Sequence, residues 1–533
     1  MLSIKSTQEI YLEEINSIKW CCMSESRKKK SLKNIAVALI SNVLIYVLSL
    51  FTSKVIKENL GLQVLGLNGV LSNIISILGL SEMGLNSIIT FALYKPLAEN
   101  DKESIKSLIH FYKKAYRIIA CIVLIIGLIL LPFIPTFIRD SSFSKTYIYI
   151  VYLLFLGSSV SSYLFVYKAT IITADQKNYI LTTASLIFTY SLKISQLLVV
   201  IFTSNYILFL SVQILLVLIY NIIISKITDR LYPFLKEKAE KLDQATYQLI
   251  ITKVKALFIS SIATIVLTST DNILISFFCG VTVAGKYTSY LSLITMISTF
   301  ITLIFENIRN SIGNFLVTES VDSKKTLYKR LFYANQTLVS ICSLCLYFLL
   351  SPFITMWLGD DVLLSNQVVF FMVLNFYLQK NRLVTEILRS TAGLFEQFKI
   401  LPLFEASINL LVSLILGKFL GLTGIILGTI ISYLLIPFWV HPFVVYKHIF
   451  AENIKEYYKT YLKYFIKTLI LYVIISYITK NFLAISATNF LSFILYAFIL
   501  FLSVSIAWII LSFRNPDQKY FINLFISKFV VPK

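Results

Sequence analysis

The sequence predicts an all-α polytopic membrane protein with about fourteen transmembrane helices. Of its 533 residues, 57% are hydrophobic and only 14% are charged, whereas about a quarter of the residues in a soluble domain are charged. The mean hydropathy is +0.80. Long apolar runs recur along the whole chain, and about 20 apolar residues suffice to cross about 30 Å of hydrocarbon. These observations together exclude a soluble globular protein.

The apolar runs fall into three groups. The first six predicted spans cover residues 34–56, 66–92, 117–138, 146–167, 179–201 and 206–225. The next six cover residues 256–278, 287–308, 332–354, 366–390, 400–418 and 422–440, and two more cover 464–479 and 489–512. The predicted division is a cytoplasmic segment 1–33, a first lobe 34–225, a basic connector 226–255, a second lobe 256–447, an amphipathic segment 448–463, a helix pair 464–512 and a cytoplasmic tail 513–533.

The basic residues predict the orientation of these spans. The formal net charge is +21, and most Lys and Arg lie in short connections, which is typical of cytoplasmic loops and not of nucleic-acid binding. Both termini are therefore expected inside the cell. The predicted outer loops contain Lys54, Lys57, Arg139, Lys145, Lys286, Lys418 and Lys480. We assign no function to residues 1–22, because Met23 is a second candidate start.

Several functions are disfavoured by what the sequence lacks. No predicted outer loop is long enough to house a catalytic domain, and no G-x-x-x-x-G-K-[ST] phosphate loop for ATP is present. The six cysteines lie mostly in or beside apolar spans, so neither a disulfide framework nor a metal site is expected. We expect a protein without enzymatic activity or cofactor, in which an ion gradient, the membrane potential or the substrate gradient supplies the energy.

Part of the first lobe recurs about 219 residues later in the chain. The turn Gly61-Leu-Gln-Val-Leu-Gly66 returns as Gly280-Val-Thr-Val-Ala-Gly285, and in each copy an apolar span and a basic segment follow. Both copies run from outside to inside, so they form a parallel repeat. Transporters are often built from two such related bundles, with the substrate path between them.

Three stretches resemble one transporter family. They are LGLQVLGLNGVLSN from Leu60, TSTDNILISFFCG from Thr268 and STAGLFEQFKILPLFEASINL from Ser390. In combination they resemble the polysaccharide transporters, the Wzx-type repeat-unit flippases of the multidrug/oligosaccharidyl-lipid/polysaccharide (MOP) superfamily. The resemblance, which covers about residues 34–512, implies two pseudo-symmetric six-helix lobes around a V-shaped central cavity, with two C-terminal helices appended. It also implies an undecaprenyl-type lipid-linked oligosaccharide as substrate.

Cations inside the predicted spans are the candidate substrate-binding residues. A pyrophosphate that crosses hydrocarbon needs fixed positive charge, because uncompensated charge is costly there. Lys193 lies in the fifth span, and Lys380 and Arg382 lie in the tenth, so the two lobes each supply a cation. The alternative is a structural role, through snorkelling or through an ion pair such as Arg382 with Glu386 one turn away.

Acids inside the spans are candidates for sodium or proton coupling. They are Glu82 in the second span, Asp271 in the seventh and Glu405 in the eleventh. Asn409 lies one turn from Glu405 on the same helix face, and Thr429 on the twelfth span is a further oxygen ligand. We place Asp271 in the outer half of the membrane and Glu405 in the inner half, which argues against one shared site. The alternative is that each acid pairs with a basic residue or caps a broken helix.

The sequence therefore predicts a flippase that moves polyprenyl-pyrophosphate-linked oligosaccharide repeat units from the inner to the outer leaflet by alternating access. Such a protein would serve capsule, exopolysaccharide or O-antigen biosynthesis in a bacterial cell membrane. We expect a monomer that contacts the bilayer and the polysaccharide polymerase machinery. The alternatives are an ion-coupled multidrug exporter of the same superfamily, and a membrane glycosyltransferase or polymerase, which would need a large outer loop.

Overall fold

The computed structural model describes residues 25–79, 85–398, 400–481 and 489–529. Every regular element within these ranges is a helix and none is a strand, which confirms the predicted all-α class. In the first half, the helices are α2 (Glu25–Leu60), α3 (Leu62–Leu78), α4 (Leu85–Ala98), α5 (Lys102–Leu130), α6 (Ile134–Phe137), α7 (Lys145–Tyr163), α8 (Val166–Ala174), α9 (Asn178–Thr203) and α10 (Tyr206–Leu231).

The second half and the C-terminal part are helical as well. They comprise α11 (Gln244–Cys279), α12 (Val281–Glu306), α13 (Arg309–Thr318), α14 (Val321–Leu358), α15 (Asn366–Asn381), α16 (Leu383–Thr391), α17 (Leu401–Leu435), α18 (Pro437–Val445), α19 (Lys455–Asn481), α20 (Phe490–Ser512) and α21 (Pro516–Phe529). Helix α17 bends at Gly421, whose φ is +57°. The bend separates the two predicted spans 400–418 and 422–440.

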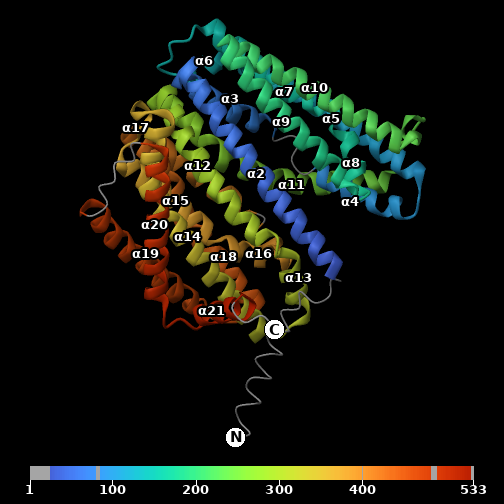
Figure 1. Ribbon diagram of the computed structural model, residues 1–533. Coiled ribbons are helices and arrows are strands. Elements are labelled where there is room, and N and C mark those ends of the chain that lie inside the picture. Colours follow the sequence, from blue (N-terminus) through green and yellow to red (C-terminus); the bar gives the residue numbers. More distant parts are fainter. Residues whose placement is uncertain (1–24, 80–84, 399, 482–488, 530–533) are drawn as a thin grey trace.

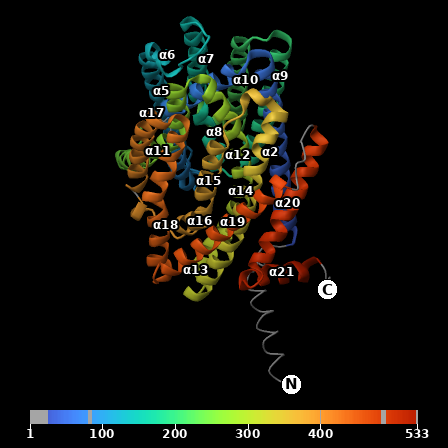
Figure 2. The same ribbon diagram turned by 90° about the vertical axis from the view of Figure 1, so that its left-hand side faces the viewer.

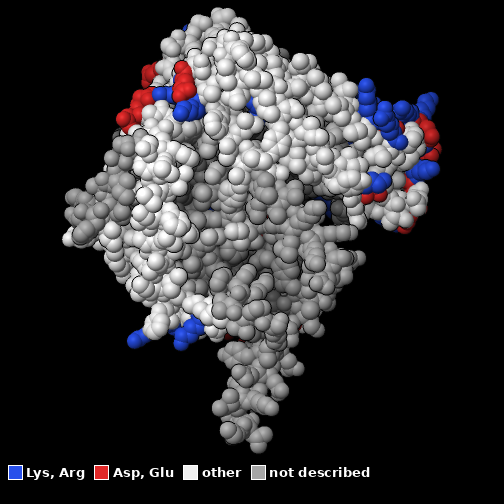
Figure 3. All heavy atoms as spheres, viewed as in Figure 1, with Lys and Arg blue, Asp and Glu red and all other residues white. Residues whose placement is uncertain are grey.

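These helices make the chain a multi-pass membrane protein. Among the described residues, ten helices or continuous helical runs are long and apolar enough to cross a membrane, and α3 is a shorter apolar helix. Each of the fourteen predicted spans overlaps a single helix, a broken helix pair such as α15 and α16, or one arm of α17. Figure 3 shows how charge is distributed on the surface. On the described part of this face, charged side chains gather at the edges and a broad uncharged zone lies between them.

The structure repeats with the offset that the sequence predicts. Helices α11, α12 and α14 each begin 219 residues after α2, α3 and α5, the separation that also joins Gln63 to Thr282. Gly61 and Gly280 occupy the same place before α3 and α12 with φ of +87° and +89°, a backbone conformation that favours glycine. The backbones of α3 and α12 cross closely, because a Cβ on Gly66 would lie 2.0 Å from the carbonyl oxygen of Val281.

The two halves meet at the helix ends that the sequence places outside. Lys57 at the end of α2 forms a 2.8 Å ion pair with Asp361 after α14. The indole nitrogen of Trp357 donates to the carbonyl oxygen of Leu50 at 3.1 Å, and Arg139 donates to the carbonyl oxygen of Phe277 at 3.3 Å. Figures 1 and 2 show α5, α7, α9 and α10 in the upper part of both views and α13 and α21 in the lower part, with α12 between them.

Candidate functional site

A cavity of about 1110 Å³ lies among the helices of the second half. Its described walls come from α11, α12, α15, α16, α17 and α18 and from the loop between α16 and α17. Asn73 on α3 is the one described lining residue from the first half. The charged side chains that line the cavity are Asp271, Lys380, Arg382, Glu386, Arg389, Glu396 and Glu405.

Lys380 is placed by a break between α15 and α16. The side-chain amide of Asn335 on α14, which is fully buried, donates to the carbonyl oxygens of Lys380 at 3.0 Å and Asn381 at 3.3 Å. This satisfies carbonyl groups that the end of a helix leaves unpaired. The ammonium group of Lys380 donates to the hydroxyl of Thr302 on α12 at 3.1 Å. No described carboxylate lies within ion-pair distance of it.

Arg382, by contrast, is paired. Its guanidinium forms ion pairs with Glu386 at 3.0 Å and with Glu405 at 3.7 Å. The predicted pair with Glu386 one turn along the chain is therefore present. Glu405 on α17, a candidate for ion coupling, closes the same cluster from the opposite wall. Two carboxylates around one guanidinium leave Arg382 little net positive charge to offer a ligand.

Asp271 belongs to a second cluster in the same cavity. The hydroxyl of Thr429 donates to one oxygen of Asp271 at 3.1 Å, and it accepts a hydrogen bond from the side-chain amide of Asn409 at 3.0 Å. The other Asp271 oxygen and the Asn409 carbonyl oxygen are buried without a hydrogen-bond partner among the described residues. Three of the residues that the sequence singled out thus converge, while Glu405 lies one turn away in the arginine cluster.

Of the remaining predicted residues, Lys193 is not part of these clusters. Lys193 on α9 is half-buried, has no carboxylate partner among the described residues and does not line the cavity. It lies one turn before Gln196, whose side-chain amide donates to Gln213 at 3.0 Å. Glu82 lies outside the described residues. The pairing of one cation from each lobe across this cavity therefore stays a prediction.

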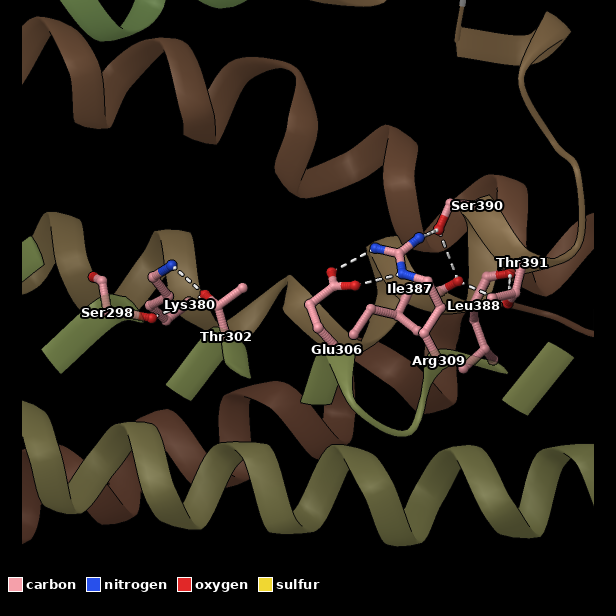
Figure 4. A network of polar contacts seen from close by, with 9 residues as sticks. All are labelled: Ser298, Thr302, Glu306, Arg309, Lys380, Ile387, Leu388, Ser390 and Thr391. Atoms are coloured by element: carbon pink, nitrogen blue, oxygen red, sulfur yellow. Dashed lines mark hydrogen bonds and ion pairs between the residues drawn. The ribbon is translucent and has the colours of Figure 1, made fainter. Parts of the chain in front are cut away.

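Sequence reasoning missed a polar stripe on α12 and the arginine, Arg309, that follows it on α13. Figure 4 shows Ser298, Thr302 and Glu306 at four-residue spacing on α12, with Lys380 beside Thr302. Arg309 forms an ion pair with Glu306 and donates to the hydroxyl of Ser390 on α16 at 2.6 Å. The four-residue spacing was the available signal, but Glu306 also ends the predicted span and fits an ordinary cytoplasmic end.

Arg389 on α16 was also missed. Its guanidinium lies 4.2 Å from the ring centre of Phe398, and its Nη1 donates to the carbonyl oxygen of Leu394 at 3.3 Å. Its Nε is buried without a hydrogen-bond partner, and no described carboxylate lies within ion-pair distance. Among the described residues that line the cavity, Arg389 and Lys380 are therefore the two cations that form no ion pair with a carboxylate.

The fold is a pair of repeated helical bundles with a cavity inside the membrane region. Comparison with solved structures shows which known fold this is. No family model matches the chain, and no curated protein matches its sequence. The lipid II flippase MurJ, in an inward closed conformation, has a TM-score of 0.63 to this chain, with 16% identity over 89% of this chain and 99% of that one.

Two further solved structures are MATE transporters. A multidrug resistance MATE family transporter of the MOP superfamily, in an inward-facing conformation, gives a TM-score of 0.56 at 13% identity, covering 74% of this chain and 94% of its own. The MATE transporter VcmN of Vibrio cholerae gives 0.53 at 13% identity, covering 80% and 98%. The chain therefore has the fold of the MOP superfamily, at identities that establish the fold alone.

Proposed function

We propose that this protein is a flippase that moves polyprenyl-pyrophosphate-linked oligosaccharides from the inner to the outer leaflet without catalysing a reaction. The observation that carries the proposal is the pair of uncompensated cations, Lys380 and Arg389, on the wall of a cavity inside the membrane bundle. A pyrophosphate offers several anionic oxygens, which an arginine can hold in a bidentate manner and a lysine can neutralise as a point charge.

In this proposal the prenyl tail stays in the lipid while the head group occupies the cavity. The cavity of about 1110 Å³ is larger than the upper end of the usual range for small-molecule sites, about 1,000 Å³, as a bulky head group requires. Lys193 would supply a cation from the first lobe in another conformation of an alternating-access cycle. The pathway would be capsule, exopolysaccharide or O-antigen assembly at the cell membrane of a bacterium, with both termini cytoplasmic and the chain acting as a monomer beside a polymerase.

We further propose that Asp271, Asn409 and Thr429 bind the coupling ion, either sodium or a proton. Their side chains are linked by hydrogen bonds through Thr429, and one oxygen each on Asp271 and Asn409 has no described partner. Buried oxygens of this kind favour a hard cation or a proton. Glu405 suits this role less, because Arg382 already compensates its charge.

An ion-coupled multidrug exporter is the second candidate. The observation that favours it is the same Asp271, a carboxylate that lines the cavity and has no basic partner among the described residues. A cationic drug would be attracted to it. The uncompensated Lys380 and Arg389 argue against this candidate, because they would repel such a drug.

Reconstituted transport tests the proposal. Liposomes that contain the protein would be loaded with an undecaprenyl-pyrophosphate-linked oligosaccharide, and its appearance in the opposite leaflet would be followed over time. We expect the wild type to move the lipid, and Lys380→Ala and Lys193→Ala to lose at least about 90% of the rate, because neutralising a buried charge partner costs several kcal/mol. Lys418→Ala, an exposed lysine outside the cavity, should retain it. A wild type that moves no such lipid but expels cationic dyes would establish the second candidate instead.

A further inference from the structure

A large aromatic side chain is exposed inside the polar cavity. Phe395 lies in the loop between α16 and α17, is 62% exposed and lines the cavity beside Glu396. Exposed aromatic side chains on the outer surface of a membrane protein face lipid and need no further explanation. Phe395 is a different case, because its ring lies beside a carboxylate on a concave polar wall. There the apolar face of the ring is exposed to water unless a ligand covers it.

The loop holds Phe395 in a fixed place. Gly393 turns the chain with φ of +72°, and the backbone N–H of Phe395 donates to the carbonyl oxygen of Gly393 at 2.9 Å. Phe398, which is buried, anchors the loop between two side chains. Its ring centre is 4.2 Å from the guanidinium of Arg389 and 4.6 Å from the ring of His441 on α18. The backbone of this loop thus places Phe395 on the cavity wall.

Polar groups without hydrogen-bond partners line the same cavity as this ring. The Nδ1 atom of His441, a residue that is only 7% exposed and lines the cavity, has no hydrogen-bond partner among the described residues, and neither has the Nε of Arg389. The carboxylate of Glu396 has no basic partner within ion-pair distance in the described part of the chain. The Nδ1 and Nε atoms are buried, so a ligand reaches them only after a local rearrangement, whereas the exposed carboxylate of Glu396 can accept from a ligand directly.

We propose that Phe395, Glu396, Arg389 and His441 form a subsite for a sugar ring of the transported substrate, an inference that rests on the proposed flippase function. A pyranose has an apolar face of C–H groups and a rim of hydroxyls that both donate and accept hydrogen bonds. Phe395 takes the apolar face, Glu396 accepts from neighbouring hydroxyls, and Arg389 donates to them. A pyrophosphate, which is anionic and only accepts hydrogen bonds, would be repelled by Glu396 and is held at Lys380 and Arg389. The guanidinium of Arg389 has several N–H groups, so it can also donate to a hydroxyl of the adjoining sugar.

Binding measurements with two lipids separate this subsite from the pyrophosphate site. Purified full-length protein in nanodiscs would be titrated with undecaprenyl pyrophosphate alone and with the same lipid carrying one hexose or one N-acetylhexosamine. We expect wild type to bind at least one glycosylated lipid about 10-fold more tightly than the bare lipid, which corresponds to the energy of one good aromatic contact with its hydrogen bonds. Phe395→Ala and Glu396→Gln should remove this preference and leave the affinity for the bare lipid unchanged.

Matched variants control the experiment. Phe395→Tyr keeps the aromatic face and should keep the preference, and Phe404→Ala removes a ring of similar exposure, 59%, that does not line the cavity. Lys380→Ala should weaken both lipids. The subsite is refuted if wild type binds the glycosylated and bare lipids equally, or if Phe395→Ala weakens both to the same extent. If wild type binds neither lipid, the proposed flippase function fails together with the subsite.

Discussion

Substituting Gly66 by alanine tests the close crossing of α3 and α12. An added Cβ would lie 2.0 Å from the carbonyl oxygen of Val281, whereas ordinary contact begins at 3.4 Å. The obstacle is backbone on a packed helix, so it cannot rotate away, and the helices would have to separate by about 1.4 Å, the difference between those two distances. Overpacking of this kind lowers the free energy of unfolding by about 1–3 kcal/mol. Because the obstacle here is backbone, we expect Gly66→Ala to lie near the upper value.

Thermal unfolding of the purified protein at one fixed heating rate is the appropriate assay, because large proteins often unfold irreversibly. At about 1 °C per kcal/mol for a chain of 533 residues, we expect Gly66→Ala to lower the unfolding temperature by about 2–3 °C. Gly157→Ala is the matched control, since its added Cβ would meet only the Cδ1 of Ile214 at 3.8 Å. It should leave the temperature unchanged or raise it slightly, because alanine favours helix. Equal unfolding temperatures for the two variants would refute the assigned crossing.

Two further predictions concern carboxylates. Asp271→Asn should abolish any sodium dependence of transport in the liposome assay, and an unchanged dependence would remove Asp271 from the coupling role. At the connection between α8 and α9, burial alone would raise the pKa of Asp175, but hydrogen bonds from Lys177 and Tyr232 outweigh it and lower the pKa. Its stabilisation is therefore present above the usual carboxyl pKa of about 3.9 and is lost as the pH falls through the lower folded-state pKa. Asp175→Asn should flatten the acid limb of the unfolding-temperature profile, and curves of identical shape would contradict this.

The helical spans and their repeat were predictable because lipid imposes length and hydropathy on each span separately. The turns at Gly61 and Gly280 were recognisable from sequence alone, but the close crossing of α3 and α12, the helices that follow them, was not predicted. The break between α15 and α16 was not predictable. No glycine or proline marks it, and the hydrogen bonds that hold it come from Asn335, which is 45 residues away from Lys380 along the chain.

The candidate site was predictable where a partner is near in sequence. Arg382 and Glu386 are one turn apart, and their ion pair was among the expected alternatives. Glu405 joins the same arginine across the cavity, a contact that depends on how α15 and α17 pack. Arg389 stands near the end of a predicted span, where an arginine ordinarily reaches water, so nothing in the sequence separated it from a cytoplasmic residue.

The contact between Gln63 and Thr282, 3.3 Å apart, has a consequence for how the two halves can diverge. These residues are counterparts in the repeat, and in a two-fold symmetric dimer each residue at the axis meets its own copy. The seam therefore resembles a dimer interface held within one polypeptide, and a substitution on one side of the axis also alters the contact that its counterpart makes on the other. Positions away from the axis escape that constraint. Asp271 is one of them, since threonine, at Thr52, stands 219 residues before it, so one half could acquire an acid without the other.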